Sequence, residues 1–362
     1  MGVIPISNQS KSLMAYTFSH FSVDFACFFM LFHGFKNSIG SLDLVAIGFL
    51  IYNVIAFGLQ PIIGFICDDN PKIPIGIIGC CIVMVGLIAS PFPWISLVLC
   101  AVGNACFHIG GGIDSLKYAN GKMFRSGIFV STGAIGVVLG TLIGQSAKSA
   151  LYLPLALIIL SIILLIIFSQ KSDSAVPCKF KIASDLPFAA IMIFALAAIV
   201  IRSYVGGVIP MAWKTTTYLL VLPSISACAG KALGGFLGDQ FGAKRVGVSS
   251  LLLSLPLLCF GKNIVLFSVI GIILFNITMP ITLCTVASKF PYNPGLAFGL
   301  TTLALLCGNL PTFFFGVSPN LVFPVLIVLI VLSAIFTLLS TQNKNGGKSY
   351  EKNIQEPKQH IV

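Results

Sequence analysis

Long apolar runs alternate with short polar stretches along almost the whole sequence. A helix of about 20 apolar residues crosses the ~30 Å hydrocarbon core of a bilayer and satisfies its own backbone hydrogen bonds there. The pattern therefore predicts an all-α membrane protein with twelve transmembrane helices. The predicted spans cover residues 12–35, 43–66, 73–91, 94–115, 124–146, 150–169, 186–209, 215–238, 244–261, 264–288, 295–317 and 319–340.

The most polar internal stretch, residues 170–185, divides these spans into two sets of six. The other connections are short, which indicates that consecutive helices pack as antiparallel neighbours. The expected organisation is an N-terminal six-helix bundle, a cytoplasmic linker, a C-terminal six-helix bundle and a polar, disordered cytoplasmic tail. Their boundaries are residues 1–169, 170–185, 186–340 and 341–362.

Lysine and arginine positions predict the orientation, because cytoplasmic loops are enriched in both. With both termini in the cytoplasm, fifteen of the 21 basic residues fall on the inner side and four in outer loops, while Arg202 and Lys231 lie within spans. We expect a multi-pass protein of the cell (inner) membrane whose first span is retained, because residues 1–12 lack the features of a signal peptide. The inner residues are Lys11, Lys72, Lys117, Lys122, Arg125, Lys171, Lys179, Lys181, Lys244, Arg245, Lys289, Lys344, Lys348, Lys352 and Lys358, and the outer ones are Lys36, Lys148, Lys214 and Lys262.

Composition agrees with a chain that faces lipid. Hydrophobic residues make up 57% and charged residues 9% of the sequence, whereas a soluble domain carries about 25% charged residues. The net charge of +11 follows from the loop asymmetry, so no nucleic-acid partner is expected. The 11 cysteines form no Cys-x-x-Cys pair and lie mostly in apolar runs. We expect buried thiols, and no disulfide framework, metal site or cofactor.

A short element occurs at the same place in both halves. Gly64 and Asp68 end the second span, and Gly235 and Asp239 end the eighth, with each residue 171 positions from its counterpart. Such internal duplication is typical of secondary transporters.

At this element the chain resembles the major facilitator superfamily, whose loop signature is Gly-x-x-x-Asp followed by a glycine and basic residues. The second copy continues through Gly242 to Lys244 and Arg245, whereas the first continues as Asp69-Asn70-Pro71-Lys72 and lacks the glycine and the basic pair. The resemblance implies the major facilitator fold, with two pseudo-symmetric six-helix bundles that rock about a central cavity, in a monomer. It also implies a gating role, with Asp239 and the basic pair anchoring helix ends by charge, for Gly64, Asp68, Gly235, Asp239, Gly242, Lys244 and Arg245.

A narrower resemblance is to the fosmidomycin-resistance-type exporters of that superfamily. His20 and Asp24 match a His-x-x-x-Asp element in the first span, and the run from Leu59 to Gly64 matches the approach to the loop. Phe107-His108 matches a Phe-His-Pro-Glu element, in which Ile109-Gly110 replace the proline and glutamate. This resemblance implies proton-coupled efflux of a drug-like or amphiphilic compound.

Ionisable residues inside spans cost about 3 kcal/mol or more and therefore usually face a wet interior. In the superfamily that the chain resembles, spans one, four, seven and ten line the cavity. His20 and Asp24 share a helix face and can take up and release a proton; otherwise they form a structural pair. His108 joins them or is a satisfied interior histidine, and Arg202 either binds an anionic group of the substrate or extends outward. The predicted substrate and proton-coupling residues are His20, Asp24, His108 and Arg202.

Two further interior charges are expected to be structural. Asp114 lies one turn from Lys117, which favours a solvated interfacial pair, and Lys231 is placed to reach the inner interface. Gly136, Gly140 and Gly144 in the fifth span have the spacing for close helix packing; the superfamily resemblance implies that this span packs against the opposite half.

These patterns favour a secondary transporter of a small solute, embedded in the bilayer and using protons as coupling ion. Two other transport-fold hypotheses stay open: proton-coupled uptake of a small metabolite, and a sensor or scaffold of transporter ancestry that moves nothing. A membrane-embedded enzyme using His20, Asp24 and His108 is disfavoured, because no catalytic motif or sizeable soluble loop accompanies them. No Walker motif is present, so ATP is not expected as the energy source.

Overall fold

The computed structural model describes residues 7–146, 150–170, 177–180, 182 and 184–342. Helices make up most of these residues, and the described chain contains no β-strand apart from an isolated bridge between Gly121 and Phe180. The predicted all-α class is therefore confirmed. The helices of the described chain lie where the sequence predicts spans, with ends that differ by a few residues.

The first half runs from the N-terminus to the connection before residue 186. Its long first helix ends in a π-helical turn, and its second and fifth spans are each built from two helices in series. The helices are α1 (Asn8–Phe29), η1 (Met30–Phe35), α2 (Lys36–Ser38), α3 (Leu42–Gly58), α4 (Gln60–Asp69), α5 (Ile75–Ile88), α6 (Pro93–Lys117), α7 (Phe124–Phe129), α8 (Gly133–Gly144) and α9 (Tyr152–Phe168).

The second half has the same succession of long helices, two of them again interrupted. The helices are α10 (Phe188–Val208), α11 (Thr217–Phe241), α12 (Ala243–Phe260), η2 (Gly261–Asn263), α13 (Val265–Asn276), α14 (Thr278–Ala287), α15 (Pro294–Asn309), α16 (Pro311–Phe314) and α17 (Val322–Ser340).

Proline accounts for three of the interruptions. Pro61 follows the break between α3 and α4, and Pro311 opens α16 after α15. Pro280 follows the break between α13 and α14 by a few residues. Proline has no N–H to donate to the carbonyl four residues earlier, and its ring clashes with that turn. A helix carrying proline therefore bends or restarts there.

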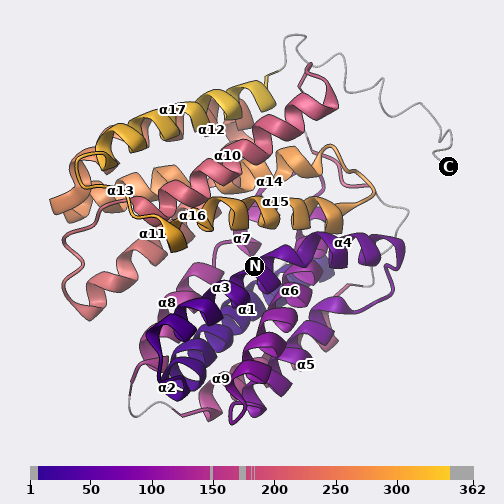
Figure 1. The fold of residues 1–362 in the computed structure, drawn as a ribbon. Helices are drawn as coiled ribbons and strands as arrows, with labels where there is room; N and C mark the ends of the chain where they lie inside the picture. Colours follow the sequence, from indigo (N-terminus) through magenta and orange to yellow (C-terminus); the bar gives the residue numbers. More distant parts are fainter. Residues whose placement is uncertain (1–6, 147–149, 171–176, 181, 183, 343–362) are drawn as a thin grey trace, which may run out of the picture.

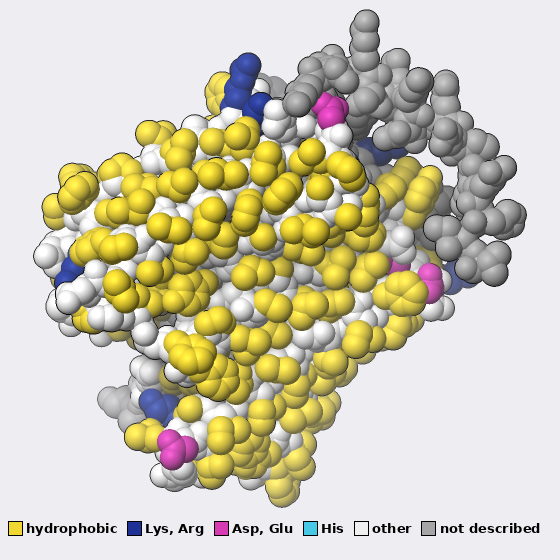
Figure 2. Space-filling view, turned by 45° about the horizontal axis from the view of Figure 1, so that its top comes forward, with side chains coloured by type: hydrophobic (Ala, Val, Ile, Leu, Met, Phe, Trp, Pro, Cys, Tyr) yellow, Lys and Arg dark blue, Asp and Glu magenta, His cyan; other side chains and the backbone are white. Residues whose placement is uncertain are grey.

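Ten helical segments of the described chain are long and apolar enough to cross a membrane. The remaining two, α5 and α9, are apolar but have 14 and 17 residues. A 14-residue helix is about 21 Å long, shorter than the ~30 Å hydrocarbon core. The face in Figure 2 is covered with hydrophobic side chains, and charged ones are few and lie toward its margins. Such a surface suits lipid and would be a liability in water.

Figure 1 shows the helices of the first half, indigo to magenta, grouped in the lower part of the view, and those of the second half above them. The two groups touch at two equivalent places. Helix α4 packs on α15, and α7 with α8 packs on α11. These two contacts position the site described below.

The end of the predicted linker is hydrogen-bonded to the loop before α15 and to the chain after α17. The Cys178 N–H donates to the Pro291 carbonyl at 2.6 Å, and the Asp185 N–H donates to the Gln342 carbonyl at 3.2 Å. Residues 171–176, 181 and 183 of the predicted linker and residues 343–362 of the predicted tail lie outside the described residues.

Candidate functional site

Three of the four predicted coupling residues meet in the interior of the first half. His20 and Asp24 come from α1 and His108 from α6, and all three are less than a tenth exposed. The His20 Nε2 to Asp24 Oδ2 distance is 3.3 Å, and the His20 Nε2 to His108 Nε2 distance is 3.0 Å. His108 Nε2 lies 3.7 Å from Asp24 Oδ1. We call His20, Asp24 and His108 the triad.

Hydrogen bonds fix the tautomer of both imidazoles. His20 Nδ1 lies 2.6 Å from the Phe129 carbonyl oxygen, and His108 Nδ1 lies 2.9 Å from the Asn104 carbonyl oxygen. A carbonyl oxygen only accepts, so each Nδ1 must carry the hydrogen and donate. In neutral rings both Nε2 atoms are then bare, and two lone pairs face each other beside the Asp24 carboxylate. The triad is therefore arranged to hold one added cation.

Two kinds of cation fit this arrangement. A proton on either Nε2 turns the facing lone pairs into a hydrogen bond, with Asp24 as the counter-charge. A metal ion is the second, because one ligand atom from each triad residue lies within 4.8 Å of the others and each imidazole is oriented by a carbonyl at its far nitrogen. The sequence predicts His20, Asp24 and His108 as coupling residues and no metal site, whereas the close spacing of their ligand atoms is a feature of the tertiary structure.

A glycine keeps the space beside the triad open. A Cβ added at Gly133, the first residue of α8, would collide with Asp24 Oδ2 and His20 Nε2. On α6, Gly111 lies against the Phe129 ring in the same way. The break between α7 and α8 thus brings the Phe129 carbonyl to His20 and a position without a side chain to His20 and Asp24.

Asn104 belongs to this site, although the sequence analysis did not include it. It is buried, and its Nδ2 donates to Asp24 Oδ1 at 3.0 Å. Asn104 precedes His108 by one helical turn, so the pair shares a face of α6. That spacing is a signal that the sequence contained.

The fourth predicted residue, Arg202, lies apart from the triad in the second half. It projects from α10, is 6% exposed, and its Nη1 donates to Thr282 Oγ1 of α14 at 3.2 Å. It does not extend to the outer surface, so that alternative is wrong. Lys231 of α11 lies close enough to Arg202 and to Asp24 for their charges to interact. The Lys231 side chain is half-buried.

The first copy of the repeated element joins the two halves. The Gly295 and Leu296 N–H groups, at the start of α15, donate to Asp68 Oδ1 and Oδ2, both at 2.8 Å. Gly64 lies against the Gly295 backbone so closely that a Cβ there would clash. An acid at a helix N-terminus satisfies orphan donors and meets the positive end of the helix dipole.

The second copy has the same geometry with the halves exchanged. Asp239 accepts from the N–H of Met123 at 2.7 Å and of Phe124 at 3.0 Å, at the start of α7, and Gly235 lies against the same backbone. We call these two contacts the carboxylate caps. Gly242, with φ +90°, turns the chain into α12.

The expected charge lock through Lys244 and Arg245 is not what holds Asp239. Both basic side chains are exposed, and no ion pair between them and Asp239 occurs among the described residues. The carboxylate instead caps a helix of the other half through backbone N–H groups.

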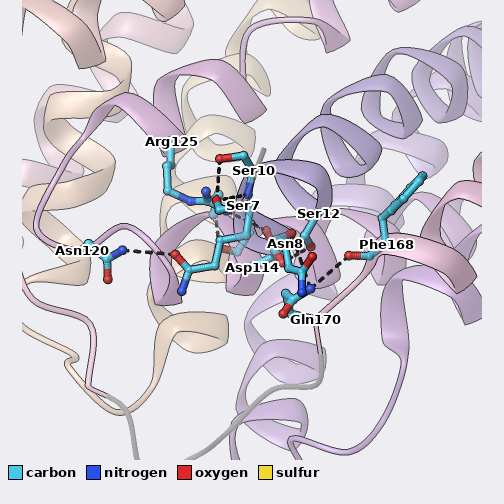
Figure 3. Close-up of polar contacts among 12 residues, drawn as sticks. Ser7, Asn8, Ser10, Ser12, Asp114, Asn120, Arg125, Phe168 and Gln170 are labelled. Carbon is cyan, nitrogen blue, oxygen red and sulfur yellow. Dashed lines mark hydrogen bonds and ion pairs between the residues drawn. The ribbon is translucent and has the colours of Figure 1, made fainter. Parts of the chain in front are cut away.

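Asp114 is buried rather than solvated, contrary to the expectation of an interfacial pair with Lys117. It accepts from Ser12 Oγ at 2.5 Å and from Arg125 Nη2 at 3.4 Å, and Arg125 also donates to the Gln9 carbonyl at 2.8 Å. Figure 3 shows this network joining the start of α1 to the end of α6. Asp114 thus ties helices of the first half together.

The glycines of the fifth span divide their packing between the halves. Cβ atoms at Gly136, Gly140 and Gly144 would meet the backbone of α1, whereas one at Gly127 would meet the backbone of α11 at Lys231 and Gly235. The three-glycine series therefore packs against α1 within its own half, whereas Gly127 of α7 packs against α11 of the other half.

No family model and no curated protein matches the chain. Solved structures do match over its length. A major facilitator superfamily transporter, FucP, in the outward conformation is 13% identical, with a TM-score of 0.62, covering 93% of this chain and 100% of FucP. A single-substitution variant of the E. coli fucose:proton symporter FucP is 13% identical with a TM-score of 0.64, covering 92% and 99%. A bacterial homologue of the iron transporter ferroportin, outward-facing, is 14% identical with a TM-score of 0.58, covering 93% and 98%.

At these identities the similarity shows the fold. The chain has the fold of major facilitator superfamily transporters, as the repeated Gly-x-x-x-Asp element predicted, and it is a multi-pass membrane protein by its ten apolar helices. The narrower resemblance to fosmidomycin-resistance-type exporters finds no support among these structures.

Proposed function

We propose that the protein is a monomeric secondary active transporter in which two six-helix bundles, residues 1–169 and 186–340, alternate access to a site between them. All twelve helical segments cross the cell (inner) membrane in this proposal, with α5 and α9 tilting least, and both termini are cytoplasmic. The fold and the two equivalent carboxylate caps support it. The caps lie on the side where the linker meets the second half, so they close the inner side in this conformation.

The triad carries the coupling ion in this proposal, and that ion is a proton. The supporting observation is the pair of bare Nε2 atoms 3.0 Å apart beside the Asp24 carboxylate. A proton held there neutralises Asp24 and joins α1 to α6. Its release leaves facing lone pairs and an unneutralised carboxylate, which favours admission of water to the site. Proton binding is thus linked to whether the site is closed.

The direction of transport is proposed to be efflux of a drug-like or amphiphilic compound in exchange for protons. In this proposal the residues serve transport rather than covalent catalysis, because the triad forms a site for a cation. His20, Asp24 and His108 bind the coupling proton, and Arg202 binds the cargo.

Purified protein in liposomes tests this proposal. With an imposed pH gradient and a panel of drug-like compounds, the wild type should exchange compound for protons, and Asp24→Asn should abolish gradient-driven flux while counterflow exchange persists. The exposed Asp43→Asn is the matched control and should behave as wild type. Gradient-driven flux that survives Asp24→Asn would sink the assignment of Asp24, and a protein that moves nothing would sink the transporter proposal. Compound movement down the same gradient as the proton would show uptake instead.

A further inference from the structure

The second half encloses a buried arginine, Arg202, and a half-buried lysine, Lys231, with almost no acid to balance their charges. Among residues 186–340 the only carboxylate is that of Asp239, and both of its oxygens are engaged by the N–H groups of Met123 and Phe124. Arg202 and Lys231 therefore have no acidic counter-charge in their own half.

Arg202 is the more demanding of the two. Its guanidinium stays charged in proteins and offers five N–H donors, yet its one partner among the described residues is the neutral Thr282 hydroxyl. No ion pair of Arg202 occurs in the described chain. A buried charge without a partner is strongly destabilising, so a native protein keeps one where a ligand supplies the missing charge.

Lys231 adds a second positive charge to the same region. Its ammonium and the Arg202 guanidinium are close enough to interact electrostatically, and like charges repel more strongly in a low-dielectric interior than in water. Asp24 of the first half also interacts with Lys231, but the two triad histidines engage that carboxylate. Asp24 therefore does not balance the repulsion between the charges of Arg202 and Lys231, and a bound anion would reduce that repulsion.

The cavity beside Arg202 shows what kind of anion fits. It measures about 20 Å³, which is room for roughly one water molecule, and most of its wall is apolar, including Ile199, Met279, Leu283 and Phe298. Its threonine hydroxyls already donate to carbonyls of their own helices: Thr282 to Thr278, Thr301 to Phe298 and Thr302 to Gly299. The guanidinium is thus the donor that the cavity offers, next to apolar side chains.

We infer that the second half binds the anionic group of the cargo at Arg202, with the positive charge of Lys231 nearby, so that the transported solute is a small organic anion with an apolar body. A carboxylate or phosphonate matches the guanidinium fork with two parallel hydrogen bonds. The cavity must widen around the cargo, which the opening of the two halves provides. This inference rests on the proposed transport function for its role in the cell, but the binding itself is measurable without transport.

The charge of the cargo is tested on one ring scaffold with the full chain in detergent. Titration calorimetry and thermal unfolding are followed with benzoate, phenylphosphonate, neutral benzamide and cationic benzylamine. Either anion should bind about tenfold or more tighter than benzamide, as expected for a charge-assisted bidentate contact, and benzylamine should not bind. Benzamide binding as tightly as both anions, or no binding of either anion, overturns the inference.

Variants separate binding from folding. Arg202→Gln and Lys231→Gln should each weaken anion binding by about tenfold or more, and Arg202→Lys should fall between Arg202→Gln and wild type because it keeps the charge and loses the fork. The exposed Lys214→Gln is the control and should bind as wild type.

Without ligand, Arg202→Gln should unfold at an equal or higher temperature, because it removes an unpaired buried charge. A merely structural Arg202 would give a lower unfolding temperature. Unchanged anion affinity in Arg202→Gln overturns the inference, and proton-driven flux of other compounds would leave the proposed function intact.

Discussion

The two halves contribute equivalent carboxylate caps to the contacts between them, but they enclose different charged side chains. Asp68 and Asp239 cap helices of the opposite half with matching geometry. The interior of the first half instead collects His20, Asp24 and His108, which suit a cation, while the interior of the second half holds Arg202 and Lys231, which suit an anion. The duplicated fold therefore repeats the contacts between the halves, whereas the interior charges differ between the two copies.

Filling the space beside the triad of the first half should have the largest effect on transport. Gly133→Ala places a methyl group against Asp24 Oδ2 and His20 Nε2, which would displace the first-half site while leaving every ionisable group in place. We expect gradient-driven flux in liposomes to fall by about tenfold or more, in line with an overpacking cost of ~1–3 kcal/mol.

Gly206→Ala is the matched control, because a Cβ at Gly206 on α10 meets nothing within 4 Å. It should retain flux, while anion binding in the second half should persist in both variants. A Gly133→Ala protein with wild-type flux would show that the triad accommodates the added methyl group and that transport does not require the close packing at Gly133.

Removing one hydrogen bond to the coupling carboxylate should have a smaller effect. Asn104→Ala takes away the Nδ2 donor 3.0 Å from Asp24 Oδ1, and a hydrogen bond to a charged group is worth about 1.5–3 kcal/mol. We expect a clear shift in the pH dependence of proton-driven flux, because only the ionised carboxylate gains fully from that donor. The Asn104→Asp substitution sharpens the result, since it replaces the donor by an acceptor and should be worse than alanine. Identical pH profiles for Asn104→Ala and the wild type would remove Asn104 from the site.

The two carboxylate caps offer a direct comparison between sequence and structure. The second copy of the loop matches the superfamily signature more fully, but Asp239 is exposed whereas Asp68 is half-buried. Water screens and competes for the exposed contact more strongly. Asp68→Asn should therefore open the inner side at least as much as Asp239→Asn, by about three- to tenfold in the population of the open state for a cap worth ~1 kcal/mol. Protection from labelling of cysteines introduced on the inner face near the caps would measure this population. An effect confined to Asp239→Asn would show that the sequence signature predicts the importance of a cap better than its burial does.

The smallest effect on transport is expected at Cys178, where the linker touches the loop before α15. Burial raises the pKa of its thiol from 9.0 to about 12, so the reactive thiolate should be about a thousandfold scarcer near neutral pH than for an ordinary cysteine. Cys178→Ser should leave flux unchanged. In a protein retaining only this cysteine, maleimide labelling should be slow, should accelerate as pH rises toward 12, and should become fast on unfolding in SDS. Rapid labelling of the folded protein would show that the linker contact is open.

The sequence by itself determined the helices, the membrane character and the relation between the halves. Hydropathy determines the helices and the membrane character, because in lipid the backbone can satisfy its hydrogen bonds in few ways. The Gly-x-x-x-Asp repeat lies at both places where the halves meet. Spacing on α1 also paired His20 with Asp24, since residues four apart on a helix lie on one face.

Only the tertiary structure decided how these pieces meet. His20 contacts His108 and the Phe129 carbonyl, which lie far from it in the chain. No helical periodicity records which helices become neighbours. Backbone N–H groups, rather than the expected basic side chains, bind the cap carboxylates. This too follows from which helix ends lie opposite Asp68 and Asp239. The lack of a partner for Arg202 is also a tertiary fact, because a charge is unpaired only in relation to everything that packs around it.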